Sequence, residues 1–83
     1  MAKWNVALVK EQGVSFAVAM VKDHVVQSRH QSEELVSSLT MRLRQPVVLL
    51  GEDNNRYFGR PDIVRFLQNV HPSRLPWREV TFN

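Results

Sequence analysis

The sequence predicts a small α+β protein, a two-layer sandwich in which two helices cover one face of an antiparallel or mixed sheet of four to five strands. Two observations predict it: period-two alternation near the N-terminus, and two later segments with helical periodicity. Because the chain has no cysteine, the fold must rest on packing. A chain of 83 residues builds one core, so we expect a single domain over residues 1–83 with no linker or targeting segment. The expected order is β-β-α-β-β-α, with a short final strand over residues 77–82 as an optional addition.

Alternating apolar residues over positions 4–22 predict a β-hairpin whose turn is Glu11-Gln12-Gly13. One face of the hairpin is bulky, and the other carries small residues. That second face has three interpretations: a sheet covered on both sides, a contact with another copy of the protein, or an ordinary half-exposed surface. The residues of the candidate homodimer interface are Ala7, Ser15, Ala17 and Ala19.

The first helix is expected to start between residues 29 and 33, after a loop over residues 23–31. Either Ser28 with Gln31 three residues later, or Ser32 before two glutamates, supplies the N-cap. Apolar residues then recur with helical spacing up to Leu43, and Pro46 ends the helix.

Residues 47–50 are apolar at every position, which predicts a strand buried on both faces and makes it the candidate for the sheet centre. Residues 51–55 carry strong turn chemistry, and residues 56–58 are expected to return antiparallel. Pro61 suits the first position of a second helix, which His71-Pro72 closes.

The formal charge of +3 at pH 7 belongs to one half of the chain. Residues 1–41 contain four basic and four acidic residues, whereas residues 42–83 contain seven arginines and four acidic residues. The excess charge is therefore C-terminal, and all of it is arginine.

The sequence lacks the residues that several classes of function require. Without cysteine there is no disulfide, thiolate metal site or iron–sulfur cluster, and the spacing of His24, His30 and His71 suits no metal site. No nucleophile motif or glycine-rich phosphate loop is present. We therefore expect a protein that is not an enzyme and uses no cofactor or metal. The longest apolar run, residues 16–21, is too short to cross a membrane, so we expect no membrane partner, and the lack of cysteine favours a cytoplasmic location.

The segment from Arg56 to Asp62 leads from a strand into a helix start, and helix starts attract anions. Guanidinium groups beside aromatic rings suit phosphate contacts and base stacking. The sequence thus favours binding of nucleic acid or another polyanion, with a protein-interaction or homodimeric assembly module as the alternative. The ordinary explanation is a solvated face in which Arg60 or Arg65 pairs with Asp62. The candidate binding residues are Arg56, Tyr57, Arg60, Arg65, Arg74, Trp77 and Arg78.

Overall fold

A computed structural model describes residues 2–11, 13–53 and 56–82. The strands are β1 (Ala2–Glu11), β2 (Val14–Val21), β3 (Val47–Gly51), β4 (Tyr57–Phe58) and β5 (Trp77–Phe82). The helices are α1 (Asp23–Gln27), α2 (Arg29–Leu43), α3 (Pro61–Leu67) and the short 3-10 turn η1 (Pro72–Arg74). The predicted α+β class and the final strand are confirmed. Gln12, Asn54 and Asn55 of the two predicted turns lie outside the described residues.

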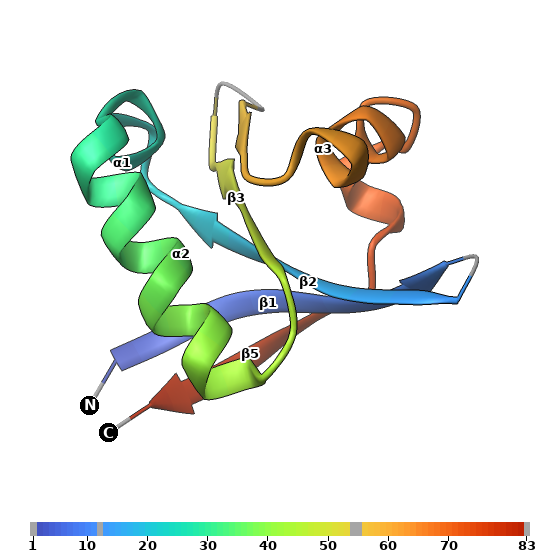
Figure 1. The fold of residues 1–83 in the computed structure, drawn as a ribbon, viewed down its shortest axis with the longest axis horizontal. Helices are drawn as coiled ribbons and strands as arrows, with labels where there is room; N and C mark the ends of the chain where they lie inside the picture. The colour runs from blue at the N-terminus through green and yellow to red at the C-terminus, as the bar shows by residue number, and fades with distance from the viewer. Residues whose placement is uncertain (1, 12, 54–55, 83) are drawn as a thin grey trace.

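The strands form one mixed sheet in the order β4-β3-β2-β1-β5. β2 and β3 are parallel, and the other neighbouring pairs are antiparallel. The first and last strands are neighbours, so the two ends of the chain lie close together (Figure 1). β3 is an interior strand buried throughout, as predicted, but β2 rather than β3 occupies the centre of the sheet.

The helices cover opposite faces of the sheet, which corrects the expectation that both lie on one face. Alternate residues of β3 belong to two separate cores: Val47 and Leu49 pack with α2, whereas Val48 and Leu50 pack with α3. In Figure 1, α2 lies on one side of β3 and α3 on the other. The reason is already present in the strand, because a segment that is apolar at every position needs a partner layer on each face.

The small residues of the hairpin serve this internal packing. Ala17 and Ala19 are fully buried beneath α2, and Ala7 is fully buried on the α3 side because it pairs with Val18. Of the four residues in the candidate interface only Ser15 is exposed. These residues therefore form no common surface that a second copy of the protein could contact, and the covered-sheet interpretation is the correct one.

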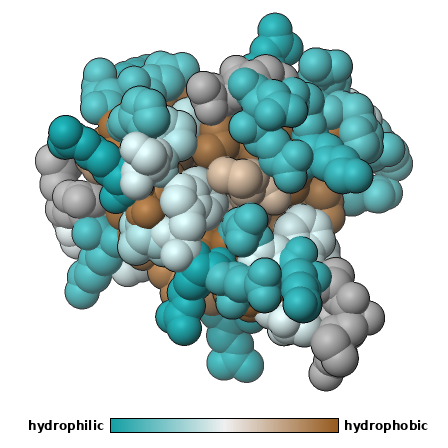
Figure 2. Space-filling model, turned by 180° about the vertical axis from the view of Figure 1, so that it is seen from behind, coloured by the Kyte–Doolittle hydropathy of each residue, from teal (hydrophilic) through white to brown (hydrophobic). Residues whose placement is uncertain are grey.

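The outer surface agrees with this burial. Seen from behind in Figure 2, hydrophilic side chains cover most of that face, and hydrophobic residues show only in the gaps between them. The large hydrophobic side chains with most exposure among the described residues are Leu8, Val14 and Met41, which come from three different elements.

The helix boundaries follow local chemistry. Ser28 caps α2, and its side chain accepts the backbone N–H of Gln31 at 3.4 Å, which confirms the first of the two predicted caps. The segment expected to be a loop contains the extra helix α1. Pro61 begins α3 as predicted, but α3 ends at Leu67, before the predicted stop at His71. Among the described residues, no helix has the length and apolar character needed to cross a membrane.

Candidate anion-binding surfaces

Four arginines on the surface have no acidic partner among the described residues. Arg44, Arg65, Arg74 and Arg78 are exposed, and none of them forms an ion pair within the part of the chain that the structure describes. Several carboxylates do have partners: Glu33 pairs with Arg29, Glu34 lies beside His30, and Glu79 pairs with Lys3. These four arginines all lie after residue 42.

Unlike these four arginines, Arg60 contacts a carboxylate, because it binds Asp62 through two hydrogen bonds. Its Nη2 and Nε donate to the two carboxylate oxygens at 2.8 and 3.2 Å. Desolvation raises the pKa of Asp62, but the Arg60 hydrogen bonds, the Ile63 backbone N–H and the Arg60 charge together hold that pKa below its usual value. The expected pairing of Asp62 with Arg60 is therefore present, and this guanidinium is already occupied.

The two candidate stacking rings belong to the core. Tyr57 and Trp77 both pack against the α3-side core, and the indole Nε1 of Trp77 donates to the carbonyl of Pro72 at 2.7 Å. Both rings are half-buried.

The residues proposed from sequence therefore divide among different places. Arg65 lies on α3, Arg74 lies in η1, and Arg56 and Tyr57 line a pocket beside α3. Arg78 lies on the other side of the sheet from Trp77, because neighbouring residues of a strand point to opposite faces. The structure does not gather all seven residues into one patch.

Arg44 is a residue that the sequence analysis missed as a candidate. It follows α2 in the left-handed conformation, with φ 58° and ψ 35°, and its backbone N–H donates to the carbonyl of Thr40 at 2.8 Å. This cap turns the chain away from the helix axis. The available sequence clue was its position directly before Gln45-Pro46, where a helix must end.

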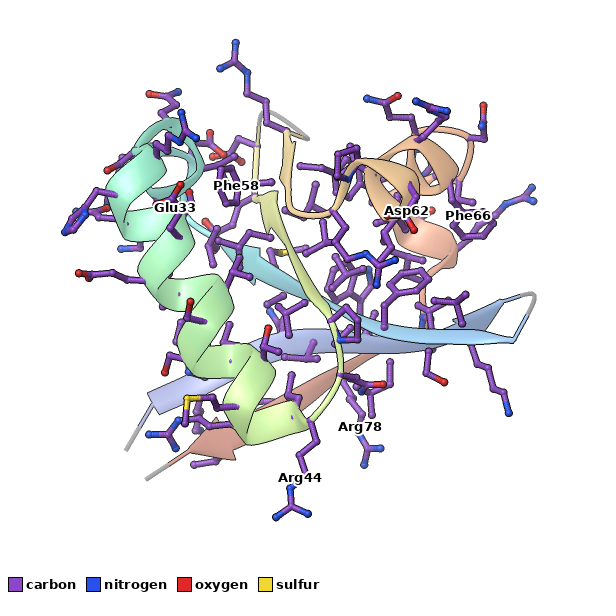
Figure 3. All side chains as sticks on the ribbon, in the orientation of Figure 1. Glu33, Arg44, Phe58, Asp62, Phe66 and Arg78 are labelled. Atoms are coloured by element: carbon purple, nitrogen blue, oxygen red, sulfur yellow. The ribbon has the colours of Figure 1, made fainter. Side chains whose placement is uncertain are left out.

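Arg44 and Arg78 come from distant parts of the chain and lie on the same side of the sheet. Arg78 is paired across the ladder with Val6, whose side chain packs beneath α2, so both residues face the α2 side. Figure 3 shows the two guanidinium groups projecting from the same edge of the molecule. We call this pair the α2-side arginine surface.

An apolar groove adjoins that surface. It has a volume of about 690 Å³ and runs between α2 and the end of β4. Val36, Val47 and Phe58 contribute its apolar walls, and Arg44 and Arg60 lie at its rim. We call it the α2–β4 groove.

A second hollow lies at the far end of the sheet. It has a volume of about 520 Å³ and is formed by α1, β4, α3 and the chain that leads into η1. Arg56, Tyr57, Gln68 and His71 contribute polar side chains to its lining. We call it the α3 pocket.

The described residues contain no group of three or more His, Asp or Glu side chains placed to hold a metal ion. Fold and surfaces together define a small α+β domain with a sheet covered on both faces and exposed arginines outside it. Comparison with models of protein families, with curated proteins and with solved structures finds no match to this chain.

Proposed function

We propose that this protein is a non-catalytic binding domain that recognises single-stranded nucleic acid through the α2-side arginine surface. The observation that carries the proposal is that Arg44, at the end of α2, and Arg78, on the edge strand β5, lie on the same side of the sheet without an acidic partner among the described residues. Two unpaired guanidinium groups on one side of a small domain attract a polyanion. The lack of cysteine supports a cytoplasmic location for this activity.

The chemistry of the two sites is complementary to that of a single strand. A guanidinium group binds phosphate through a planar pair of N–H donors. The neighbouring α2–β4 groove supplies an apolar wall that includes the half-buried ring of Phe58, against which an unpaired base could pack. In a duplex the bases are already stacked, so a groove of this kind favours a single strand over a double one.

Ala7, Ala17 and Ala19 are fully buried inside one chain, so the small-residue sheet face offers a second copy no surface for a homodimer. A protein partner at the α2–β4 groove stays an outcome of the test below.

The direct test is fluorescence anisotropy with a labelled single-stranded oligonucleotide at low salt, repeated at rising salt. We expect affinity to fall steeply between about 50 and about 200 mM salt, as phosphate-dominated binding requires. The double variant Arg44→Gln/Arg78→Gln should bind about tenfold more weakly. It should also reduce the slope of log affinity against log salt by about 1.4, the contribution of two phosphate contacts on a single strand.

The matched control is Arg65→Gln/Arg74→Gln, which removes the same charge from two exposed and unpaired arginines outside the α2-side arginine surface. This control variant should lose much less affinity for the oligonucleotide. Equal losses in the two double variants would contradict a localised site, and absence of binding at low salt would rule out nucleic-acid recognition. Binding of an acidic peptide but not of the oligonucleotide would identify a protein partner instead.

A further inference from the structure

The two edges of the sheet differ in length. β4 forms one edge and contains two residues, whereas β5 forms the other edge and contains six. Natural proteins commonly protect a sheet edge by making its strand very short, as β4 is. Among the described residues no strand pairs with the outer side of β5. We infer that this side of β5 pairs with β5 of a second copy of the chain, in a symmetric antiparallel dimer.

The backbone of β5 is regular along its whole length. It pairs with β1 at six successive positions without a bulge, and Pro76 lies before its first residue rather than inside it. Bulges, prolines and lysines are devices that protect an exposed edge, and β5 contains none of them. In an antiparallel ladder, alternate residues direct their N–H and C=O groups away from the neighbouring strand. The outer side of β5 therefore offers a regular row of donors and acceptors.

The charged residues of β5 select one register for this pairing. In a two-fold symmetric antiparallel pair, opposite residues lie on the same face, so one residue at the centre faces its own copy. A centre at Arg78 or Glu79 would place like charges opposite each other, which is unfavourable. A centre at Val80 avoids this contact and joins residues 78–82 of both strands. A centre at Thr81 would join only residues 80–82.

The register centred on Val80 also brings compatible side chains together. Glu79 then faces the partner's Thr81, and the carboxylate can accept a hydrogen bond from the hydroxyl. Both residues are exposed and lie on the same face as Trp77, which packs on the α3 side. Within its own chain Glu79 contacts Lys3 at 3.9 Å, an exposed ion pair that leaves acceptor sites on the carboxylate.

Arg78 does not prevent the pairing. In this register the Arg78 residues of the two copies are offset by four positions along the strands, which is about 13 Å. That separation exceeds the Debye length of about 8 Å at physiological salt, so their repulsion is largely screened.

The dimer would enlarge the α2-side arginine surface, a consequence that rests on the proposed function, whereas the pairing itself does not. The two-fold axis is perpendicular to the joined sheet, so the α2 sides of both copies lie on the same side. Arg44 and Arg78 project from one edge of a single chain (Figure 3). The second copy contributes the same two arginines. A strand of nucleic acid that contacts both copies would therefore favour the dimer.

The test is analytical ultracentrifugation of the intact chain without nucleic acid. Edge pairing alone buries less surface than a standard interface, so we expect a reversible monomer–dimer equilibrium between about 10 µM and about 1 mM. Thr81→Glu places a carboxylate opposite the partner's Glu79 at two symmetric positions and should raise the dissociation constant about tenfold. Thr81→Lys places an ammonium group there and should lower it by a similar factor.

Two controls separate edge pairing from general effects of charge and folding. Ser37→Glu and Ser37→Lys make the same charge changes on an exposed position of α2 and should leave the equilibrium unchanged. Glu79→Lys/Thr81→Glu restores an opposite-charge pair across the axis and should recover the dimer that Thr81→Glu loses. Thermal unfolding at low concentration shows that each variant is folded.

A chain that stays monomeric up to about 1 mM would overturn the inference. A dimer that responds equally to Thr81→Glu and Thr81→Lys, or to neither, would also contradict pairing through β5 in this register. These outcomes are separable from the oligonucleotide experiment, because no nucleic acid is present. A dimer that binds no oligonucleotide would refute the proposed function and leave the pairing intact.

Discussion

At the scale of single residues, the buried hydroxyl of Ser32 joins two helices. Ser32 has no exposed surface, and its Oγ donates to the carbonyl of Val25 in α1 at 2.6 Å. Ser32→Ala would leave that carbonyl without this donor. We expect the free energy of unfolding to fall by about 1–2 kcal/mol. Urea denaturation measures the change, and Ser38→Ala on the exposed part of α2 is the control, with an expected loss below about 0.5 kcal/mol.

Gly59 is a position where the fold has no room for a side chain. A Cβ atom built there would lie 2.7 Å from Cγ2 of Val48 and 3.1 Å from its Cα. Because Val48 belongs to a fully buried strand, it cannot move away easily. Gly59→Ala should therefore destabilise the protein by about 1–3 kcal/mol, the usual effect of overpacking. A thermal midpoint equal to that of the original protein would show that the β4–α3 connection adjusts freely.

Tyr57 is the only tyrosine in the chain, so absorbance at high pH reports its ionisation alone. Desolvation raises its pKa in the folded state. The titration of the folded protein should therefore have its midpoint above the value of about 10 found for an exposed tyrosine, and urea should restore that value. Since the folded pKa is the higher one, the associated stability is complete below the unfolded pKa and is lost as pH rises through the folded pKa. A midpoint identical in folded and urea-unfolded protein would contradict the burial.

The register of the hairpin explains why Ala7 and Ala17 were wrongly placed on one face from sequence. Alternation predicts which residues of one strand share a face, but it does not fix the register between two strands. The structure pairs Ala7 with Val18 and places Ala17 opposite Leu8. Ala7 thus lies on the α3 side and Ala17 on the α2 side, and no rule of composition within either strand distinguishes this register from the alternative.

At the scale of elements, α2 ends in a cap whose residue type is not optimal. Arg44 has a left-handed backbone conformation. This conformation is unfavourable for a residue with a Cβ atom and is not unfavourable for glycine. Arg44→Gly should stabilise the protein by about 0.5–1 kcal/mol. The control Ser37→Gly, on the exposed surface inside α2, should destabilise it by a similar amount. A loss of stability in Arg44→Gly would mean that the guanidinium contributes more to the native state than the backbone strain removes.

Most helices and strands could be predicted from sequence, because neighbouring residues determine where each begins. The N-cap at Ser28 and the start of α3 at Pro61 depend on residues within one turn of the helix end. α1 was missed because it is held by a contact with Ser32, seven residues beyond Val25, rather than by a periodic apolar stripe. The turn η1 was also missed, and its Pro72 accepts a hydrogen bond from Trp77 of β5, a contact between two elements that local sequence does not show.

At the scale of the whole molecule, the arrangement of layers was decided by tertiary packing. Residues 47–50 already indicated burial on both faces, yet a sandwich with both helices on one face leaves one side of that strand exposed. In the structure, β2 and β3 contribute residues to both cores, so both faces of these strands are covered. For the candidate sites, sequence identified the arginine-rich half but could not show that Arg44 and Arg78 lie on the same side of the sheet, since 34 positions of chain separate them.

The shared strands predict that the two cores unfold together, and the chain carries a natural reporter for each. Trp4 packs against the α2-side core and Trp77 against the α3-side core. The variants Trp77→Phe and Trp4→Phe each leave one of these rings as the fluorescent probe. When Leu39→Ala is added to either variant, we expect the free energy of unfolding to fall by the same amount, about 2–4 kcal/mol, because Leu39 is buried in the α2-side core. The two probes should report the same change because the two cores unfold as one cooperative unit. If Leu39→Ala moved the transition seen by Trp4 and left the one seen by Trp77 in place, the two faces of the sheet would be independent folding units.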